Sequence, residues 1–468
     1  MAEANPGILT EIRGDDAITK PTSRARAVNS LSDWAITVAI FLMLLAPALW
    51  NGYPLLQSDT GGYLARWYEG YLVPSRSTAF GLYLHYGETT FFWLNLAIQA
   101  LATIWVLRVT LRVFGLAKPW QVFILCLVLS STTALPWLTS MLLTDIFAGL
   151  SVLSLFVLVV YGDRISGIEK AALFVFTAFA AATHSATMAV LLGLCCVGWM
   201  VRPFLHARIA TASLAQGTLT IAAGAIMLLS ANFALSGQVA WTPGGSAIAF
   251  ARMLQDGIVT RYLRDHCAEQ HFKLCPYRDE LPETADDFLW SRETVFNKLG
   301  RFPGMNDEMG YIAMHALAEY PLWQAEAALM ASGEQMLKVA TGENTDPPTT
   351  AHTYGIIRRY LPDNVKPMNA ALQQTGFITF GPINLIHVPV ALISTALVLA
   401  LLIAALFRRR SDGVTLLMAT VFLALLGNAV ICGVISGPHD RYGSRLVWIT
   451  TCTLMIAAMR RFSIPKPT

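Results

Sequence analysis

The side chains best suited to chemistry in this 468-residue chain lie near the ends of apolar segments. Asp59 lies a few residues after the first apolar run, in QSDTGGYLARWYEGY, and Asp145 lies in a later run, in LLTDIFAGL. His184 separates two further apolar runs. Because ionisable groups are costly in lipid, such positions indicate a functional site or a substrate path.

Basic residues that could bind phosphate occur in two places. Arg76 follows the first apolar run, where its planar guanidinium group could bind a phosphate bidentately, and His85 lies on the same loop. The turn before the last apolar run reads GPHDRYGSR and supplies four more candidates, His439, Asp440, Arg441 and Arg445. With a carboxylate as general base and cations around a phosphate leaving group, this set suits a reaction on an anionic lipid.

Each candidate also has a purely structural explanation. Asp59 could cap the helix that follows it, and a single intramembrane Asp or His is often hydrogen-bonded to a neighbouring helix. The functional interpretation therefore requires that Asp59, Asp145, His184 and Arg441 surround one cleft.

The elements that must position these residues are transmembrane helices. With 55% hydrophobic and 13% charged residues, the chain has more apolar side chains than a soluble protein buries. A run of about 20 apolar residues crosses a hydrocarbon core about 30 Å thick. About ten such runs are expected, at 34–52, 89–110, 119–136, 139–160, 168–186, 187–203, 211–235, 385–407, 413–435 and 443–459.

The distribution of Lys and Arg predicts the orientation. Basic clusters follow the even-numbered runs, so ten spans place all of them on one side, which the positive-inside rule makes cytoplasmic. The expected fold class is an all-α integral membrane protein of about ten transmembrane helices with a mostly helical extracytoplasmic domain. We expect a multi-pass protein of the bacterial inner membrane, with both termini cytoplasmic and the large domain periplasmic.

The expected organisation has five parts. They are a disordered cytoplasmic tail at 1–33, a membrane domain with seven spans at 34–235, an extracytoplasmic helical domain at 236–384, C-terminal membrane helices at 385–459 and a cytoplasmic tail at 460–468. Within the first membrane domain, loop 53–88 contains an aromatic-rich amphipathic helix after Asp59, which we expect in the plane of the membrane interface.

Two of the seven cysteines fall in the expected extracytoplasmic domain. Cys267 and Cys275 are eight residues apart in CAEQHFKLC, where an oxidising compartment would permit a disulfide. The two thiols could instead bind zinc together with His266 and His271, although the spacing matches no standard zinc finger.

Several classes of function have no support in the sequence. The net charge of +3 is small and the basic residues are scattered, which argues against nucleic-acid binding. The chain has no GxxxxGK[ST], GxGxxG, HExxH or GxSxG motif for nucleotide, dinucleotide, zinc-protease or serine-hydrolase chemistry. A reaction would therefore draw its energy from the substrate, as with a lipid-linked activated sugar.

The layout resembles the C-type (GT-C) glycosyltransferase superfamily of polytopic membrane enzymes. Its members place an acidic residue in the first extracytoplasmic loop, ahead of an interfacial helix, and Asp59 occupies that position. The resemblance implies that Asp59 is the catalytic base and that Asp145 matches an acidic stretch at the outer end of a later span. It also implies that His439, Arg441 and Arg445 face the lipid phosphate.

The partners that the resemblance implies are membrane lipid, a polyprenyl-phosphate-linked sugar donor and a glycan or lipid acceptor. Arg76, His184 and Asp145 would line the cavity. The sequence departs from the superfamily in lacking an acidic pair in the first loop and a WWD-like motif, which leaves a divalent metal ion and the acceptor undetermined. The stretch WTPGGSAIAFARMLQDGIVTRYLRDHC also resembles part of an uncharacterised family of bacterial membrane proteins, which implies no activity.

Two other classes of function remain. In a transporter or flippase of a lipid or small anionic solute, Asp145 and His184 would belong to a path through the membrane, with polar groups near its midplane. In a non-catalytic membrane assembly protein, Asp59 would be only a helix cap.

Overall fold

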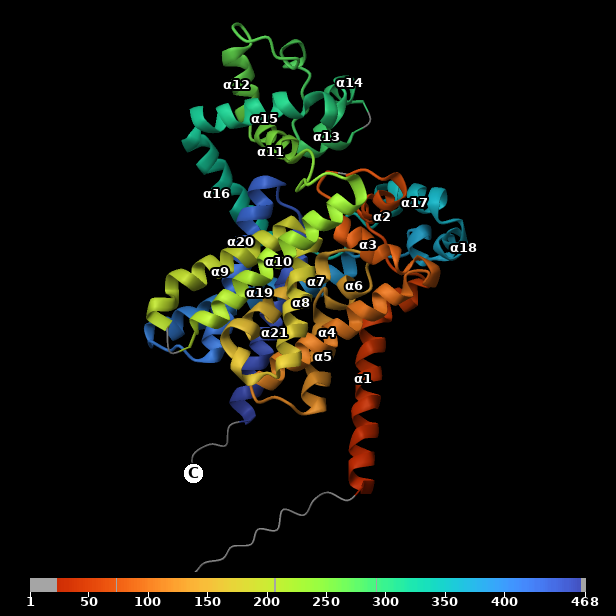
Figure 1. The fold of residues 1–468 in the computed structure, drawn as a ribbon, viewed down its shortest axis with the longest axis vertical. Coiled ribbons are helices and arrows are strands. Elements are labelled where there is room, and N and C mark those ends of the chain that lie inside the picture. Colours follow the sequence, from red (N-terminus) through yellow and green to blue (C-terminus); the bar gives the residue numbers. More distant parts are fainter. Residues whose placement is uncertain (1–22, 73, 206–207, 292, 464–468) are drawn as a thin grey trace, which may run out of the picture.

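The computed structural model describes residues 23–72, 74–205, 208–291 and 293–463, with side chains from residue 33 to 462 (Figure 1). Helix α1 begins at Ser23, so residues 23–33 are helical although the sequence predicts a disordered tail there. The remainder of that predicted tail, 1–22, lies outside the described residues, as does 464–468 of the C-terminal one.

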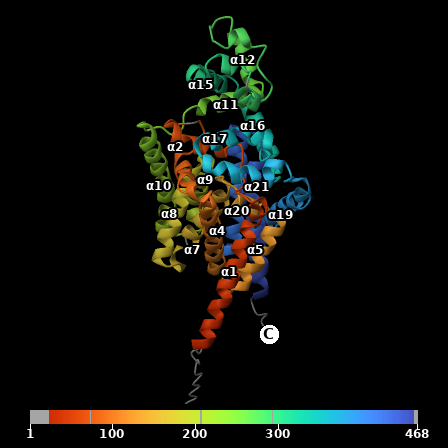
Figure 2. The ribbon, with the colours of Figure 1, turned by 90° about the vertical axis from the view of Figure 1, so that its right-hand side faces the viewer.

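Most of the described chain is helical, and these residues contain no strand beyond an isolated bridge between Leu55 and Met141. One set of helices forms a bundle, called here the membrane body (Figures 1 and 2). Its elements are α1 (Ser23–Asn51), α4 (Trp93–Val113), α5 (Pro119–Thr132), α6 (Leu135–Thr139), α7 (Asp145–Tyr161), η2 (Gly162–Arg164), α8 (Gly167–Thr183), α9 (Ser185–Leu205), α10 (Thr211–Ser236), α19 (Gly381–Phe407), α20 (Gly413–Ile435) and α21 (Asp440–Ser463).

Seven helices of the described chain are long and apolar enough to cross a membrane. They are Asp33–Asn51, Trp93–Val113, Asp145–Arg164, Ser185–Leu205, Thr211–Ser236, Gly381–Phe407 and Gly413–Ile435. The chain is thus an all-α membrane protein. The other three predicted spans correspond to α5 and α8, which have 14 and 17 residues, and to α21, whose first turns carry charged side chains.

The predicted spans 119–136 and 139–160 differ from the helices that form. The first divides into α5 and the short α6, which has a proline in its first turn. Residues 140–142 then run beside the first loop, where Leu55 donates its N–H to Ser140 and accepts from the N–H of Leu142, each at 3.0 Å. The next helix therefore starts only at Asp145, which begins α7 and does not lie inside a helix that starts at residue 139, as the predicted span 139–160 implied.

The predicted extracytoplasmic segment 236–384 divides between two hydrophobic cores. Its first part forms a compact unit beyond the end of the bundle, called here the outer unit, with a core that includes Phe250, Phe288 and Met309 (Figures 1 and 2). The outer unit consists of α11 (Gly245–Gln255), α12 (Ile258–His266), η3 (Cys275–Tyr277), α13 (Ala285–Trp290), α14 (Val295–Lys298) and α15 (Arg301–Glu319). Helix α16 (Pro321–Leu337) leads back to the bundle and packs along α20.

The rest of the segment packs on the first loop and shares the core of the membrane body through Tyr354, Ile357 and Met368. It forms α17 (Pro347–Tyr360), α18 (Pro362–Ala370) and η4 (Leu372–Thr375), while the first loop forms α2 (Thr60–Glu69), α3 (Thr78–His85) and η1 (Glu88–Thr90). Helices α3 and α17 cover α2, so that Tyr63 and Leu64 are buried in protein. The expected interfacial helix thus has its apolar face against other helices.

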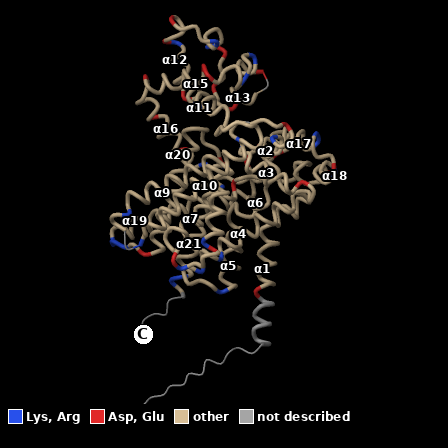
Figure 3. Tube along the Cα trace, viewed as in Figure 1, with Lys and Arg blue, Asp and Glu red and all other residues tan. Residues whose placement is uncertain are grey.

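Charged residues divide between the two ends of the molecule. Figure 3 shows Lys and Arg gathered at the helix ends farthest from the outer unit, with mostly uncharged chain between. Arg112 at the end of α4 pairs with Glu169 of α8 at 2.6 Å, and Arg460 near the end of α21 lies 6.0 Å from the ring of Phe114. The ends of α4 and α21 and the start of α8 therefore share one face of the bundle.

Candidate functional site

Arg441 connects two carboxylates from distant parts of the chain. Its Nε and Nη2 donate to the two oxygens of Asp145 at 2.8 and 3.3 Å, and its Nη1 donates to Oδ2 of Asp59 at 2.5 Å. Asp59 and Arg441 are 382 residues apart in the sequence. Because a guanidinium group presents five donors in a fixed plane, one side chain can hold both carboxylates at once.

Arg76 holds the second oxygen of Asp59. Its Nη2 donates to Oδ1 of Asp59, so both carboxylate oxygens are engaged by guanidinium groups. Asp59 precedes α2 at the N-cap position, but its side chain makes no capping hydrogen bond there. Gly62 leaves room for Arg76, because a Cβ at this glycine would lie 3.3 Å from Cγ and Nε of the arginine.

The four side chains, called here the Arg441 network, lie at the boundary between the buried bundle and solvent. The side chain of Asp145 is 2% exposed and that of Arg441 10%, whereas Asp59 and Arg76 are 19% and 18% exposed. Burial alone would raise the pKa of Asp59, but the charges of Arg76 and Arg441 and their hydrogen bonds lower it below its ordinary value. Asp59 is therefore an ionised carboxylate at neutral pH.

Arg445 lies one turn after Arg441 on α21 and has different partners. Its Nη2 and Nε donate to Oδ1 of Asn428 at 2.6 and 3.2 Å, and its Nη1 donates to Nδ1 of His184 at 3.2 Å. A fourth contact joins Nη2 to Sγ of Cys432 at 3.3 Å. Arg445 is fully buried, and none of these partners carries a negative charge.

His439 and Asp440 lie beside the Arg441 network and contact the loop between α16 and α17. Nδ1 of His439 lies 2.9 Å from Oε1 of Glu343, whose other oxygen accepts from the backbone N–H of Arg441 at 2.8 Å. Asp440 accepts from the backbone N–H of Ala340 at 2.8 Å, so its carboxylate fastens this loop. The loop can approach α21 so closely because residue 443 is a glycine, where a Cβ would lie 1.9 Å from the carbonyl oxygen of Lys338.

His85, predicted with the other site residues, lies elsewhere. It ends α3, its Nδ1 lies 3.0 Å from Glu88, and its ring stacks on Trp67 at 6.5 Å between centroids. With its side chain 45% exposed and no contact to Arg76 or Arg441 among those described, His85 does not belong to the site. His85 shares the first loop with Asp59, but its described contacts include Trp67, Tyr68 and Glu88 instead.

Three residues of the site were not found from the sequence. Glu343, Asn428 and Gln335 lie in segments without a motif, although Gly342 and Asn344, both at positive φ, mark the turn that presents Glu343. Gln335 accepts from the backbone N–H of His439 at 2.9 Å and donates to its carbonyl oxygen at 2.8 Å. It thereby fixes the backbone of the turn before α21.

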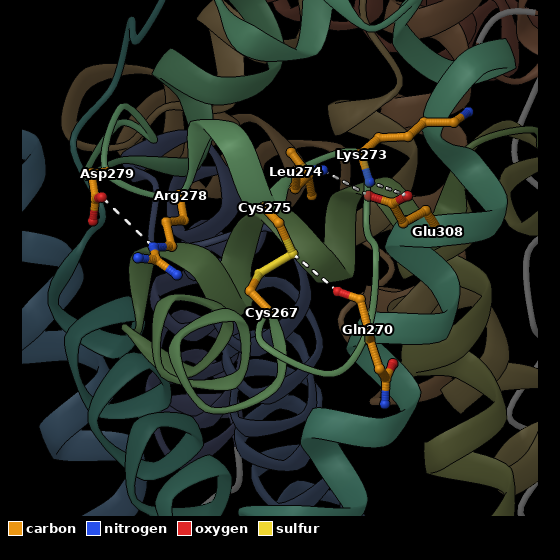
Figure 4. The surroundings of a disulfide bond; sticks show 8 residues. All are labelled: Cys267, Gln270, Lys273, Leu274, Cys275, Arg278, Asp279 and Glu308. Carbon is orange, nitrogen blue, oxygen red and sulfur yellow. Dashed lines mark hydrogen bonds and ion pairs between the residues drawn. A yellow bond between two sulfur atoms is a disulfide. The ribbon is translucent and has the colours of Figure 1, made fainter.

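The cysteine pair belongs to the outer unit and not to the site. Cys267 and Cys275 form a disulfide (Figure 4). Glu308 of α15 accepts from the backbone N–H groups of Lys273 and Leu274 at 2.8 and 3.1 Å and holds the intervening loop. The two sulfur atoms bond to each other and so do not serve as the zinc ligands considered above.

The described residues do not fit a bound metal ion. Among them, no group of three or more His, Cys, Asp or Glu side chains is placed to hold one. Asp59 and Asp145 are instead neutralised by Arg441, which donates hydrogen bonds to both carboxylates.

No family model matches the chain, and neither a curated protein nor a solved structure matches it.

Proposed function

We propose that the chain is a membrane glycosyltransferase that moves a sugar from a polyprenyl-phosphate donor to an extracytoplasmic glycan or lipid. The observation that carries this proposal is the Arg441 network, in which two guanidinium groups converge on one partly exposed carboxylate, Asp59. Guanidinium groups bind phosphate and carboxylate with the same paired geometry, so a lipid phosphate can replace Asp59 as their partner.

The proposed topology has ten spans, with α5, α8 and α21 joining the seven apolar helices. The positive-inside rule then puts the basic ends of α4 and α21 in the cytoplasm and the outer unit in the periplasm of a bacterial inner membrane. In that orientation the Arg441 network lies at the periplasmic end of the bundle. A polyprenyl phosphate anchored in the outer leaflet would present its phosphate at this depth.

The charges of the site suit a phosphate leaving group. In the resting state two carboxylates neutralise Arg76 and Arg441. When the donor phosphate displaces one oxygen of Asp59, the two guanidinium groups stabilise the negative charge that develops as the bond to the sugar breaks. Arg445, buried among neutral partners, adds positive charge one helical turn away.

The positions of Asp145 and His184 favour this proposal over transport. Asp145 is the first residue of α7, and His184 lies between α8 and α9, so both lie at helix ends. A transporter is expected to carry polar groups near the midplane, with access from both sides.

The test is donor-dependent sugar transfer by the purified full-length protein. Polyprenyl-phosphate sugars with different radiolabelled head groups are incubated with membrane glycans, and products are identified by mass spectrometry. We expect transfer by the wild type and its loss in Arg441→Gln, with activity retained in the control Arg358→Gln, which changes an exposed arginine of α17. The proposal is overturned if no donor yields product, or if Arg441→Gln transfers as fast as wild type.

A further inference from the structure

His439 and Glu343 form a carboxylate–imidazole pair, and the second ring nitrogen of His439 lies 3.8 Å from Asp286, too far for a hydrogen bond. Nδ1 of His439 lies 2.9 Å from Oε1 of Glu343, and an ionised carboxylate can only accept a hydrogen bond. The proton of neutral His439 therefore resides on Nδ1, which leaves the lone pair on Nε2. A carboxylate that fixes the tautomer in this way turns an imidazole into a directed proton acceptor.

The pair is held in place by backbone contacts on both sides. Gln335 of α16 bonds the N–H and the carbonyl oxygen of His439, and Glu343 accepts from the N–H of Arg441 at 2.8 Å. The carboxylate of Glu343 thus orients the imidazole of His439 and also bonds the backbone of Arg441, the residue proposed to bind the phosphate. A shift of His439 relative to Arg441 would break one of these bonds.

The imidazole is also open to solvent. Its side chain is 26% exposed and that of Glu343 is 25% exposed, more than those of Arg441 and Asp145. Oδ2 of Asp286 from α13 lies 3.8 Å from Nε2, so the outer unit approaches this side of the imidazole. The exposed imidazole and the partly exposed Asp59 and Arg76 of the Arg441 network are thus both accessible to a substrate from solvent.

The charged groups that face His439 come from three elements. Glu343 and Asp286 favour the imidazolium form, whereas Arg441 disfavours it. The hydrogen bond to Glu343 outweighs burial and raises the pKa of His439 above its ordinary value. A proton-accepting side chain is the most effective general base when its pKa lies near the working pH.

We propose that Nε2 of His439, oriented by Glu343, accepts the proton of the acceptor hydroxyl in the transfer reaction. This assignment rests on the proposed function and replaces Asp59 as the base. The O–H bond breaks and its proton moves to Nε2, while the oxygen electron pair forms a bond to the anomeric carbon. The bond from that carbon to the phosphate oxygen breaks, and its electron pair leaves with the polyprenyl phosphate, next to Arg76 and Arg441.

Asp59 is less suited to this step. Both of its oxygens accept hydrogen bonds from guanidinium groups, and its pKa is lowered. Its proton affinity is therefore small in the resting site, and we assign it the positioning of Arg76 and Arg441.

The first experiment needs no substrate. Diethyl pyrocarbonate modifies neutral imidazoles, so peptide-level mass spectrometry of the intact protein across a pH series gives the titration midpoint of each histidine. We expect a higher midpoint for His439 than for His352, an exposed histidine of α17 that serves as reference. Glu343→Gln should lower the midpoint of His439 and leave that of His352 unchanged. Equal midpoints in the wild type, or no response to Glu343→Gln, would overturn the pairing.

The second experiment measures kcat/KM for transfer against pH. We expect an acid limb at the midpoint of His439, a shift of that limb in Glu343→Gln, and a loss of about 100-fold or more in His439→Gln. If His439→Gln keeps its rate and the limb lies in the carboxylate range, Asp59 is the base, and the proposed function stands without this inference. If the wild type transfers no sugar, the proposed function and the catalytic role fail together, whatever the labelling shows.

Discussion

Arg441 and Arg445 lie one turn apart on α21, yet only Arg441 has negatively charged partners. Arg441 bonds two carboxylates, whereas the fully buried Arg445 bonds Asn428, His184 and Cys432. Removing a cation that is paired with anions leaves those anions buried and uncompensated, while removing one that is surrounded by neutral groups does not. From this contrast we infer that Arg441 stabilises the structure of the site. The charge of Arg445 is not compensated by a carboxylate and is therefore available to attract an anionic ligand.

Arg441→Gln should have the largest effect on stability. It leaves Asp59 and Asp145 without their common partner, and breaking a buried ion pair costs about 3–5 kcal/mol. Thermal unfolding followed by size-exclusion chromatography in detergent measures the loss. The double variant Arg441→Gln with Asp145→Asn should recover part of it, and a single variant as stable as wild type would contradict the account of the network.

Asp145→Asn should have the second-largest effect on stability. Asp145 is almost completely buried and receives two hydrogen bonds from Arg441, and a hydrogen bond to a charged group contributes about 2 kcal/mol. Asp59→Asn should destabilise less in the same assay, because Asp59 and Arg76 are partly solvated. The reverse order of these two variants would show that Asp59 is the principal anchor of Arg441.

Arg445→Met should destabilise less than Arg441→Gln. It removes a buried charge whose partners are neutral, and the main cost, about 1–3 kcal/mol, is that Oδ1 of Asn428 keeps only the weak thiol donor of Cys432 at 3.6 Å. Sugar transfer should nevertheless fall, because one positive charge near the phosphate is lost. A variant that unfolds like Arg441→Gln would remove the contrast between the two arginines.

His439→Gln should have the smallest effect on stability, and the effect should depend on pH. Because Glu343 raises the pKa of folded His439, the stabilisation is complete below the ordinary pKa of about 6.5 and is lost as pH rises through the raised value. The difference in melting temperature between wild type and variant should therefore be largest below about pH 6.5 and shrink as the pH rises above that value. A difference that grows with pH would contradict the ion pairing.

Much of the fold was predictable because lipid imposes simple rules. Apolar runs of the right length predict the seven helices that are long and apolar enough to cross a membrane, and basic loops predict which helix ends share a face. The predicted spans erred where tertiary contacts override hydropathy. Residues 140–142 are apolar enough to extend a helix, but they pair with Leu55 of the first loop instead.

The residue types of the site were evident from the sequence, because Asp59, Asp145 and Arg441 are ionisable groups beside apolar runs. The sequence did not show which helix ends meet. The contact between Asp59 and Arg441 joins positions 382 residues apart and depends on how the bundle packs. Glu343 and Asn428 carry no local signal, because their roles follow from the positions of His439 and Arg445. The composition of the chain thus determined that its apolar helices are suited to lipid, and the sequence showed which kinds of side chain the site contains. Only the packing of the helices decided which of these charged side chains pair with one another.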